Sequence, residues 1–180
     1  MRISRLFLAA GLTGVIASPL AAQQAASDMP ESYRQVQGSA LELQRKMLLA
    51  MVDSMPERLY RDKATPAQRD FAQQVEHATG AVTGIVSRVL GATPPATRPD
   101  TAVSLNTRAG LRGYINSTYD WAGAALMNQR DRAKQVDLFG HKMPAWQVWD
   151  EIHQHTVWTA GQLVANFRKH GMAPPGFAFF

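Results

Sequence analysis

The sequence predicts an all-α fold, a four-helix bundle with a long proline-rich crossover between its second and third helices. Apolar residues recur at three- and four-residue spacing in four separate stretches. Proline-rich or polar segments separate these stretches, and no segment has convincing strand alternation or an internal repeat. The 180-residue chain contains no cysteine, which excludes disulfides, thiolate metal sites and covalently attached c-type haem.

The first 22 residues have the three parts of a signal peptide. Arg2 and Arg5 are followed by an apolar stretch and by small residues, with a cleavage position after Ala22. The apolar stretch is shorter than the ~20 residues that a membrane-spanning helix needs, and no cysteine offers a lipid anchor. We therefore expect a periplasmic protein without a membrane anchor, with 23–30 as a disordered lead-in and 31–180 as one domain.

The formal net charge of +5 falls by two when Arg2 and Arg5 leave with the signal peptide. The remaining charged residues are scattered, without a run of like sign and without interleaved aromatic residues. We therefore expect no nucleic acid among the partners. An unknown small molecule is the expected ligand, and homodimerisation remains open.

The first two helices are predicted from their start signals and their apolar spacing. Asp28 and Pro30 start the first helix, which ends at Pro56. Thr65 is the predicted N-cap of the second helix, with Pro66 at its first position and Gln68 in a capping box. The inward residues are expected to be Leu41, Met47, Leu48, Met51 and Val52 in the first helix, and Phe71, Val75, Ala78, Val82, Ile85 and Val89 in the second.

Residues 91–100 form the predicted proline-rich crossing, which is long for a helix–helix connection. A third helix is expected from about Asp100 to Leu126, and a polar loop over 128–144. The inward residues of the third helix are expected to be Leu105, Leu111, Ile115, Tyr119 and Ala122.

Pro144 is predicted to open the fourth helix, and Gly171 to end it shortly before Pro174. The inward residues of this helix are expected to be Trp149, Ile152, Thr156, Leu163 and Phe167.

Two histidines are candidate metal ligands because mid-helix histidines on different helices can converge inside a bundle. His77 lies in the second predicted helix and His155 in the fourth. Glu151 lies one turn before His155 and is an auxiliary candidate. His153 points away from His155, since residues two apart on a helix face different directions. His141 is expected in a loop, and His170 at a helix C-terminus, where a cation interacts favourably with the carbonyl end of the helix dipole.

The chain resembles the DinB-like superfamily of four-helix-bundle, metal-dependent proteins over roughly residues 35–177. The resemblance lies in "MVDSMPERLY", "PAQRDFAQQVEHATG", "FGHKMPAWQVW" and the motif H-x3-T-x-GQL-x4-R-x2-G-x2-PP. It implies three histidine ligands for a divalent ion, of which two correspond to His77 and His155. The third position is Thr159, whose neutral hydroxyl is a poor ligand for zinc or nickel.

Three function classes follow. The first is an exported DinB-like hydrolase or transferase with a weak or degenerate divalent-metal site at His77 and His155, with Glu151 and Thr159 as auxiliary residues. The second is a metal-free binding or structural bundle, with an apolar pocket that Trp146, Trp149, Trp158 and methionines line. The third is a non-covalent haem bundle with histidine and methionine ligands, which no motif favours.

Overall fold

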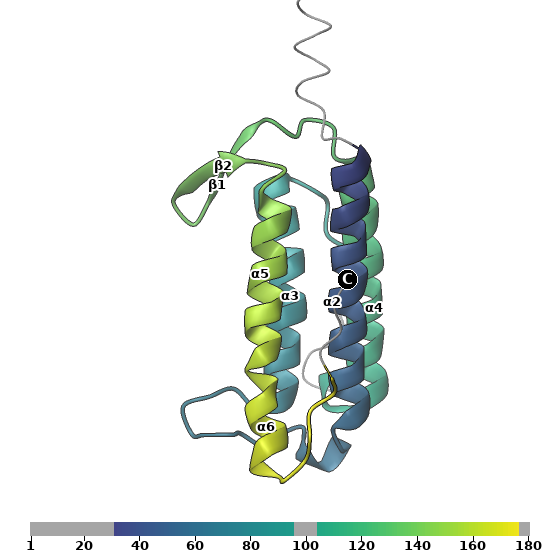
Figure 1. Cartoon of the computed structure of the whole chain (residues 1–180), viewed down its shortest axis with the longest axis vertical. Coiled ribbons are helices and arrows are strands. Elements are labelled where there is room, and N and C mark those ends of the chain that lie inside the picture. Colours follow the sequence, from purple (N-terminus) through teal and green to yellow (C-terminus); the bar gives the residue numbers. More distant parts are fainter. Residues whose placement is uncertain (1–30, 96–103, 177–180) are drawn as a thin grey trace, which may run out of the picture.

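The computed structural model describes residues 31–95 and 104–176, and this part of the chain is mainly helical (Figure 1). The long helices lie side by side, α2 next to α4 and α3 next to α5. Contacts between α3 and α4, and between α2 and α5, complete the packing. Among the described residues, no helix is both long enough and apolar enough to cross a membrane. The helices are α2 (Glu31–Ser54), α3 (Phe71–Leu90), α4 (Arg108–Asn128), α5 (Val148–Gly161) and α6 (Leu163–Lys169), and the short 3-10 turns are Glu57–Leu59 and Ser104–Asn106.

The apolar positions predicted to face inward form the core of these helices. Almost all of them are buried, including Val75 and Val82 on α3 and Ile115 on α4. Met47 and Val89 are partly buried and pack against the same core. Helical spacing alone therefore identified which face of each helix is covered.

The start of α3 corrects the prediction that Thr65 caps the second helix. The observed N-cap is Asp70, whose side chain accepts the backbone N–H of Gln73 at 2.8 Å. The side chain of Gln73 in turn accepts a hydrogen bond from the backbone N–H of Asp70 at 3.1 Å, which completes a capping box. Thr65 lies in a preceding turn, where its carbonyl accepts the N–H of Gln68 at 3.1 Å. The helix begins later because Asp70, 2% exposed, supplies the buried acceptor.

A β-hairpin replaces part of the predicted polar loop over 128–144. Strand β1 (Gln135–Leu138) pairs antiparallel with β2 (His141–Pro144). The connecting residues Phe139 and Gly140 have φ of 54° and 88°, as a two-residue hairpin turn requires. Asp137 stabilises the turn by accepting the N–H of Gly140 at 2.7 Å. The prediction of no strand was therefore wrong.

Several predicted helix boundaries also shift. Helix α4 begins at Arg108 and not near Asp100, because Thr107 caps it by accepting the N–H of Gly110 at 3.1 Å. Pro144 pairs with Gln135 in the sheet, so the fourth helix opens only at Val148.

Other predicted features lie wholly or partly outside the described residues. The signal peptide, the lead-in and the Asp28–Pro30 helix start belong to 1–30. Only the beginning of the proline-rich crossing, 91–95, is described, and it has no regular secondary structure.

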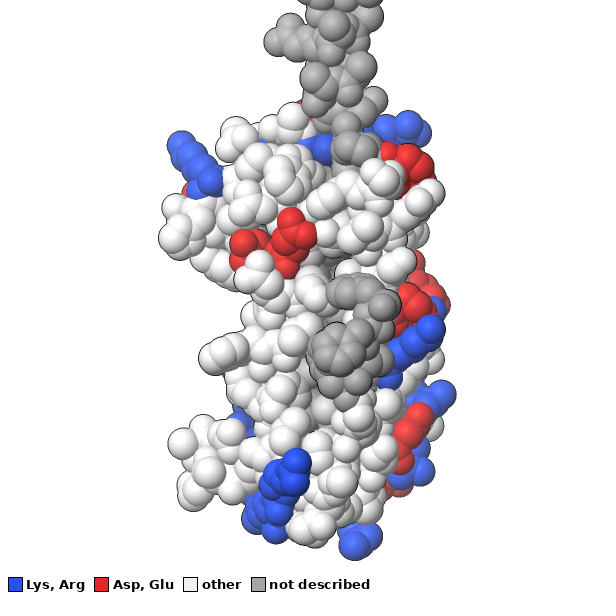
Figure 2. All heavy atoms as spheres, viewed as in Figure 1, with Lys and Arg blue, Asp and Glu red and all other residues white. Residues whose placement is uncertain are grey.

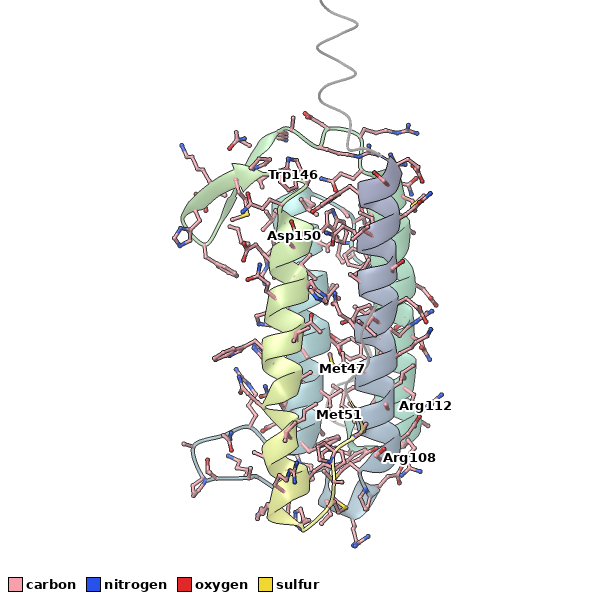
Figure 3. The ribbon with its side chains drawn as sticks, viewed as in Figure 1. Met47, Met51, Arg108, Arg112, Trp146 and Asp150 are labelled. Atoms are coloured by element: carbon pink, nitrogen blue, oxygen red, sulfur yellow. The ribbon has the colours of Figure 1, made fainter. Side chains whose placement is uncertain are left out.

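A polar contact joins the first turns of α2 and α5. The hydroxyl of Tyr33 donates to Asp150 Oδ2 at 2.8 Å, and Gln37 Nε2 donates to Asp150 Oδ1 at 2.5 Å. The ring of Trp146 meets Tyr33 edge-on with ring centres 5.5 Å apart. Figure 3 shows Trp146 and Asp150 at the end of α5 that lies nearest the hairpin. Burial and the Asp150 carboxylate raise the pKa of Tyr33, so this hydroxyl stays protonated as the donor.

Charged side chains of both signs alternate along the edge formed by α2 and α4, whereas the middle of the face over α5 carries few charges (Figure 2). Arg45 contacts both Glu42 and Asp120, the latter at 2.7 Å, and Arg112 contacts Asp53. Figure 3 places Arg112 and Arg108 on the lower part of this edge. The pairs with Asp120 and with Arg112 join α2 to α4 at the surface, and the pair with Glu42 lies within α2; each contributes little stability.

Candidate functional site

His77 and His155 lie side by side in the structure. Their ring centres are 5.3 Å apart, and their ring planes meet at 70°. His77 comes from the first half of α3 and His155 from the middle of α5, and these helices run in opposite directions (Figure 1). Both side chains are partly buried, so the pair lies in a position that solvent can reach.

Gln74 sets the relative position of the two helices next to the histidine pair. Its Nε2 donates to the carbonyl oxygen of Thr159 at 3.0 Å and lies 3.2 Å from Gln162 Oε1. Gln74 is one turn before His77, and Thr159 is one turn after His155. This hydrogen bond between α3 and α5 therefore fixes how far one helix is shifted along the other, and so places the two imidazoles opposite each other.

The surroundings of the pair favour neutral imidazoles. Burial lowers the pKa of His155, and the positive charge of Arg69 lowers it further. Burial is also the largest cause of the lowered pKa of His77, followed by Arg69 and by His155 itself. Neutral imidazole is the form that binds metal ions. Both side chains are therefore in the ligand-competent state at pH 7.

The two auxiliary candidates are placed differently from the sequence expectation. Glu151 faces the hairpin, where it lines surface hollows together with Phe139 and His141. In residues 31–95 and 104–176, no three His, Asp or Glu side chains gather in a metal-binding cluster. Thr159 is 2% exposed and offers its backbone carbonyl to Gln74. An auxiliary role for Glu151 or Thr159 at the histidine pair stays a prediction.

The other helical histidine, His153, belongs to a separate polar network. Its Nδ1 lies 3.0 Å from Gln44 Nε2, and Gln44 Oε1 accepts the hydroxyl of Tyr119 at 3.3 Å. Burial raises the pKa of Tyr119. This network joins α2, α4 and α5 on the side of α5 away from the histidine pair, which agrees with the expectation that His153 and His155 point in different directions.

The last two histidines have local roles. His170, after the end of α6, has its Nε2 3.1 Å from Asp62 Oδ2. His141 is exposed and lies on strand β2, not in the predicted loop.

The predicted aromatic pocket does not form, because its three tryptophans have different surroundings. Trp149 is 1% exposed within the core, whereas Trp146 is 38% and Trp158 is 76% exposed. Trp158 follows His155 by three residues and therefore lies on a neighbouring part of the helix surface. The interpretation as one pocket lined by these three residues was wrong.

Two residues at the site were not identified from the sequence, Arg69 and Gln74. The signal for Gln74 was its spacing, since a residue three before His77 faces the same neighbouring helix. Arg69 offered no such signal, because the sequence placed it inside the second predicted helix, whereas in the structure it precedes α3.

Comparison of the chain with protein-family models and with curated proteins gave no match in either case.

Proposed function

We propose that His77 and His155 bind a divalent transition-metal ion, zinc or nickel, in an exported four-helix bundle of the DinB-like type. The observation that carries the proposal is the 5.3 Å separation of the two ring centres. In this proposal the ion is held weakly and serves a hydrolase or transferase reaction. Residues 1–22 are the signal peptide, and the proline-rich segment that begins at Gly91 is the crossover between the second and third helices of the bundle.

The separation matches what one shared ion requires. Zinc–nitrogen bonds of ~2.0–2.1 Å, with about 1.1 Å more from the nitrogen to the ring centre, put each ring centre about 3.2 Å from the ion. At the tetrahedral angle, two such rings have centres about 5.2 Å apart. The observed distance between His77 and His155 is 5.3 Å. The two ring centres therefore lie at the separation that one shared ion requires.

Charge explains why the binding is expected to be weak. The lowered pKa values of His77 and His155 reduce competition from protons. The same positive charge on Arg69 also repels a cation. Catalytic zinc sites usually have three protein ligands plus water. With only two imidazoles, the ion has a smaller binding free energy and more than one position for water.

The chemistry that such an ion supplies when bound is Lewis acidity toward water or a substrate oxygen. The imidazoles of His77 and His155 would hold and orient it without neutralising its charge. Arg69, an exposed cation near both rings, would attract an anionic group of the substrate. Gln74 would keep the two helices at the level at which the rings meet.

Isothermal titration calorimetry with zinc and nickel tests the proposal on the native protein and on His155→Gln. We expect weak binding of one ion by the native protein and at least tenfold weaker binding by His155→Gln. The matched control is His153→Gln, which removes a histidine two residues away that contacts Gln44. Equal affinity of the native protein and His155→Gln would refute the metal site.

A second pair of variants tests the third position of the site. Thr159→His is expected to strengthen binding, since a third imidazole one turn after His155 adds a ligand. Adding His155→Gln to this variant should remove the gain. Because Thr159 is 2% exposed, circular dichroism must first confirm that the variant folds. A folded Thr159→His protein that binds no tighter than the native one would contradict the assignment of this position.

A further inference from the structure

A cavity lies at the hairpin end of the molecule, far along the helices from the histidine pair. It has a volume of about 490 Å³, within the range of small-molecule sites. The C-terminal ends of α3 and α4 form two of its sides, and the hairpin region forms another. Figure 1 shows the hairpin at the end of the molecule where α3 ends. Its apolar wall is built from aliphatic and aromatic side chains of three helices, which include Val86, Val89, Leu90, Trp121, Ala125 and Trp149.

The indole N–H groups of the two tryptophans in this wall already have hydrogen-bond partners. The indole N–H of Trp149 donates to Gln129 Oε1 at 2.6 Å. The indole N–H of Trp121 donates to the carbonyl oxygen of Thr93 at 2.8 Å. Both rings are therefore held in place. Trp149 is 1% exposed and lies behind the apolar wall, whereas the ring of Trp121 is partly exposed and a ligand can cover it without a lost hydrogen bond.

Two cations, Arg130 and Lys134, lie among the residues that surround the cavity, and both are exposed. Within the described part of the chain, neither has a carboxylate at ion-pair distance. Asp131 is the acidic neighbour, and its Oδ1 accepts the backbone N–H of Lys134 at 3.2 Å. The side chains around the opening therefore carry a net positive charge.

A cation near the end of α4 has another explanation, since helix C-termini attract positive charge. Arg132 already fills that role. It is 4% exposed, and its Nε donates to the carbonyl oxygen of Gln129 at 2.9 Å, directly after the helix. The end of α3 is closed by Gly91, whose N–H donates to the carbonyl oxygen of Val86. Arg130 and Lys134 are therefore available for a ligand.

We propose that this cavity binds a small amphipathic anion, with its alkyl or aromatic body against Trp121, Val89 and Leu90 and its carboxylate at Arg130 and Lys134. The apolar wall accounts for the body of the ligand, and the two cations account for its charged end. The site is separate from the histidine pair and does not require a metal ion.

Calorimetric titration of the full-length protein with sodium decanoate and, separately, with 1-decanol tests the proposal. Decanoate should bind at least tenfold more tightly than decanol, because only decanoate carries the anionic group. In Arg130→Gln/Lys134→Gln the affinity for decanoate should fall at least tenfold, to that of decanol. The matched control is Arg58→Gln/Lys63→Gln, which removes the same charge at the opposite end of the helices and should leave both affinities unchanged.

Filling the cavity provides an independent test. Ala125 is a partly buried wall residue, and Ala125→Phe should weaken decanoate binding at least tenfold by occupying the space of the ligand. The proposal is overturned if decanoate does not bind, if it binds no better than decanol, or if Arg130→Gln/Lys134→Gln binds it as the native protein does. Both cations are exposed, so that double variant gives an answer even if Ala125→Phe fails to fold.

Discussion

Replacing Asp70 by alanine should destabilise the protein by about 2 kcal/mol. Loss of an aspartate N-cap typically costs ~1 kcal/mol, within a range of ~0.5–2. Asp70 is also 3.2 Å from Arg61, and a pair with one exposed partner adds at most ~1 kcal/mol. The acceptor that Gln73 provides for the N–H of residue 70 remains in the variant, because that N–H belongs to the backbone.

Thr65→Ala is the matched control, since Thr65 was the N-cap predicted from the sequence. Its exposed hydroxyl has a contact at 3.3 Å with Gln68 Oε1, so its loss should cost less than ~0.5 kcal/mol. Asp70→Asn keeps an acceptor oxygen at the cap and loses the charge that faces Arg61. Its cost should lie between those of the two alanine variants.

Urea unfolding followed by far-UV circular dichroism at pH 7 measures these differences in the free energy of unfolding. For a chain of this length, the ~2 kcal/mol of Asp70→Ala corresponds to a fall in Tm of roughly 4–8 °C. The reasoning fails if Thr65→Ala costs as much as Asp70→Ala. It also fails if Asp70→Ala costs less than ~0.5 kcal/mol, which is the usual effect of a surface substitution.

Three further predictions concern the core, the histidine pair and the N-terminus. Val82 is 1% exposed, so Val82→Asp should lower the free energy of unfolding by more than ~4 kcal/mol, because it buries an unpaired charge. Urea unfolding measures this loss, and a loss below ~1 kcal/mol would contradict the place of Val82 in the core. Because the folded state lowers the pKa of His77 and His155, the unfolded chain takes up these protons first, and stability should decline as pH falls below about 6.5. In His77→Gln/His155→Gln the decline should be smaller, and an unchanged pH profile would rule out this contribution. Protein recovered from the native host should begin near Gln23, and an intact Met1 would exclude cleavage.

The sequence was most informative where many residues act together. Each helix shows its buried face through several apolar positions, so one misplaced residue does not change the prediction. The buried side chains of Leu111 and Ile115 on α4, and of Ile152 and Leu163 on α5 and α6, follow this spacing. Fold class and core could therefore be predicted without knowledge of the contacts between helices.

Features that depend on one or two residues were predicted poorly. Thr65 and Asp70 both have the chemistry of an N-cap, and only the path of the loop before α3 decides that Asp70 is the acceptor. The hairpin has strands of four residues and a Phe139–Gly140 turn, which lacks the Asn-Gly or Asp-Gly pair typical of such turns. Short strands with a weak turn signal resemble a polar loop in sequence.

The candidate site shows the same division between what spacing predicts and what packing decides. Helical spacing correctly separated His153 from His155, because the directions of side chains two apart on one helix are fixed by the helix itself. Spacing also put Glu151 on the side of His155, yet the hairpin packs nearby and Glu151 lines hollows with its residues. The approach of His77 to His155 depends on how far α3 is shifted along α5, and the bond from Gln74 to the Thr159 carbonyl stabilises that position. A helix predicts which residues share its own face, but the level at which two helices meet comes from contacts such as this one.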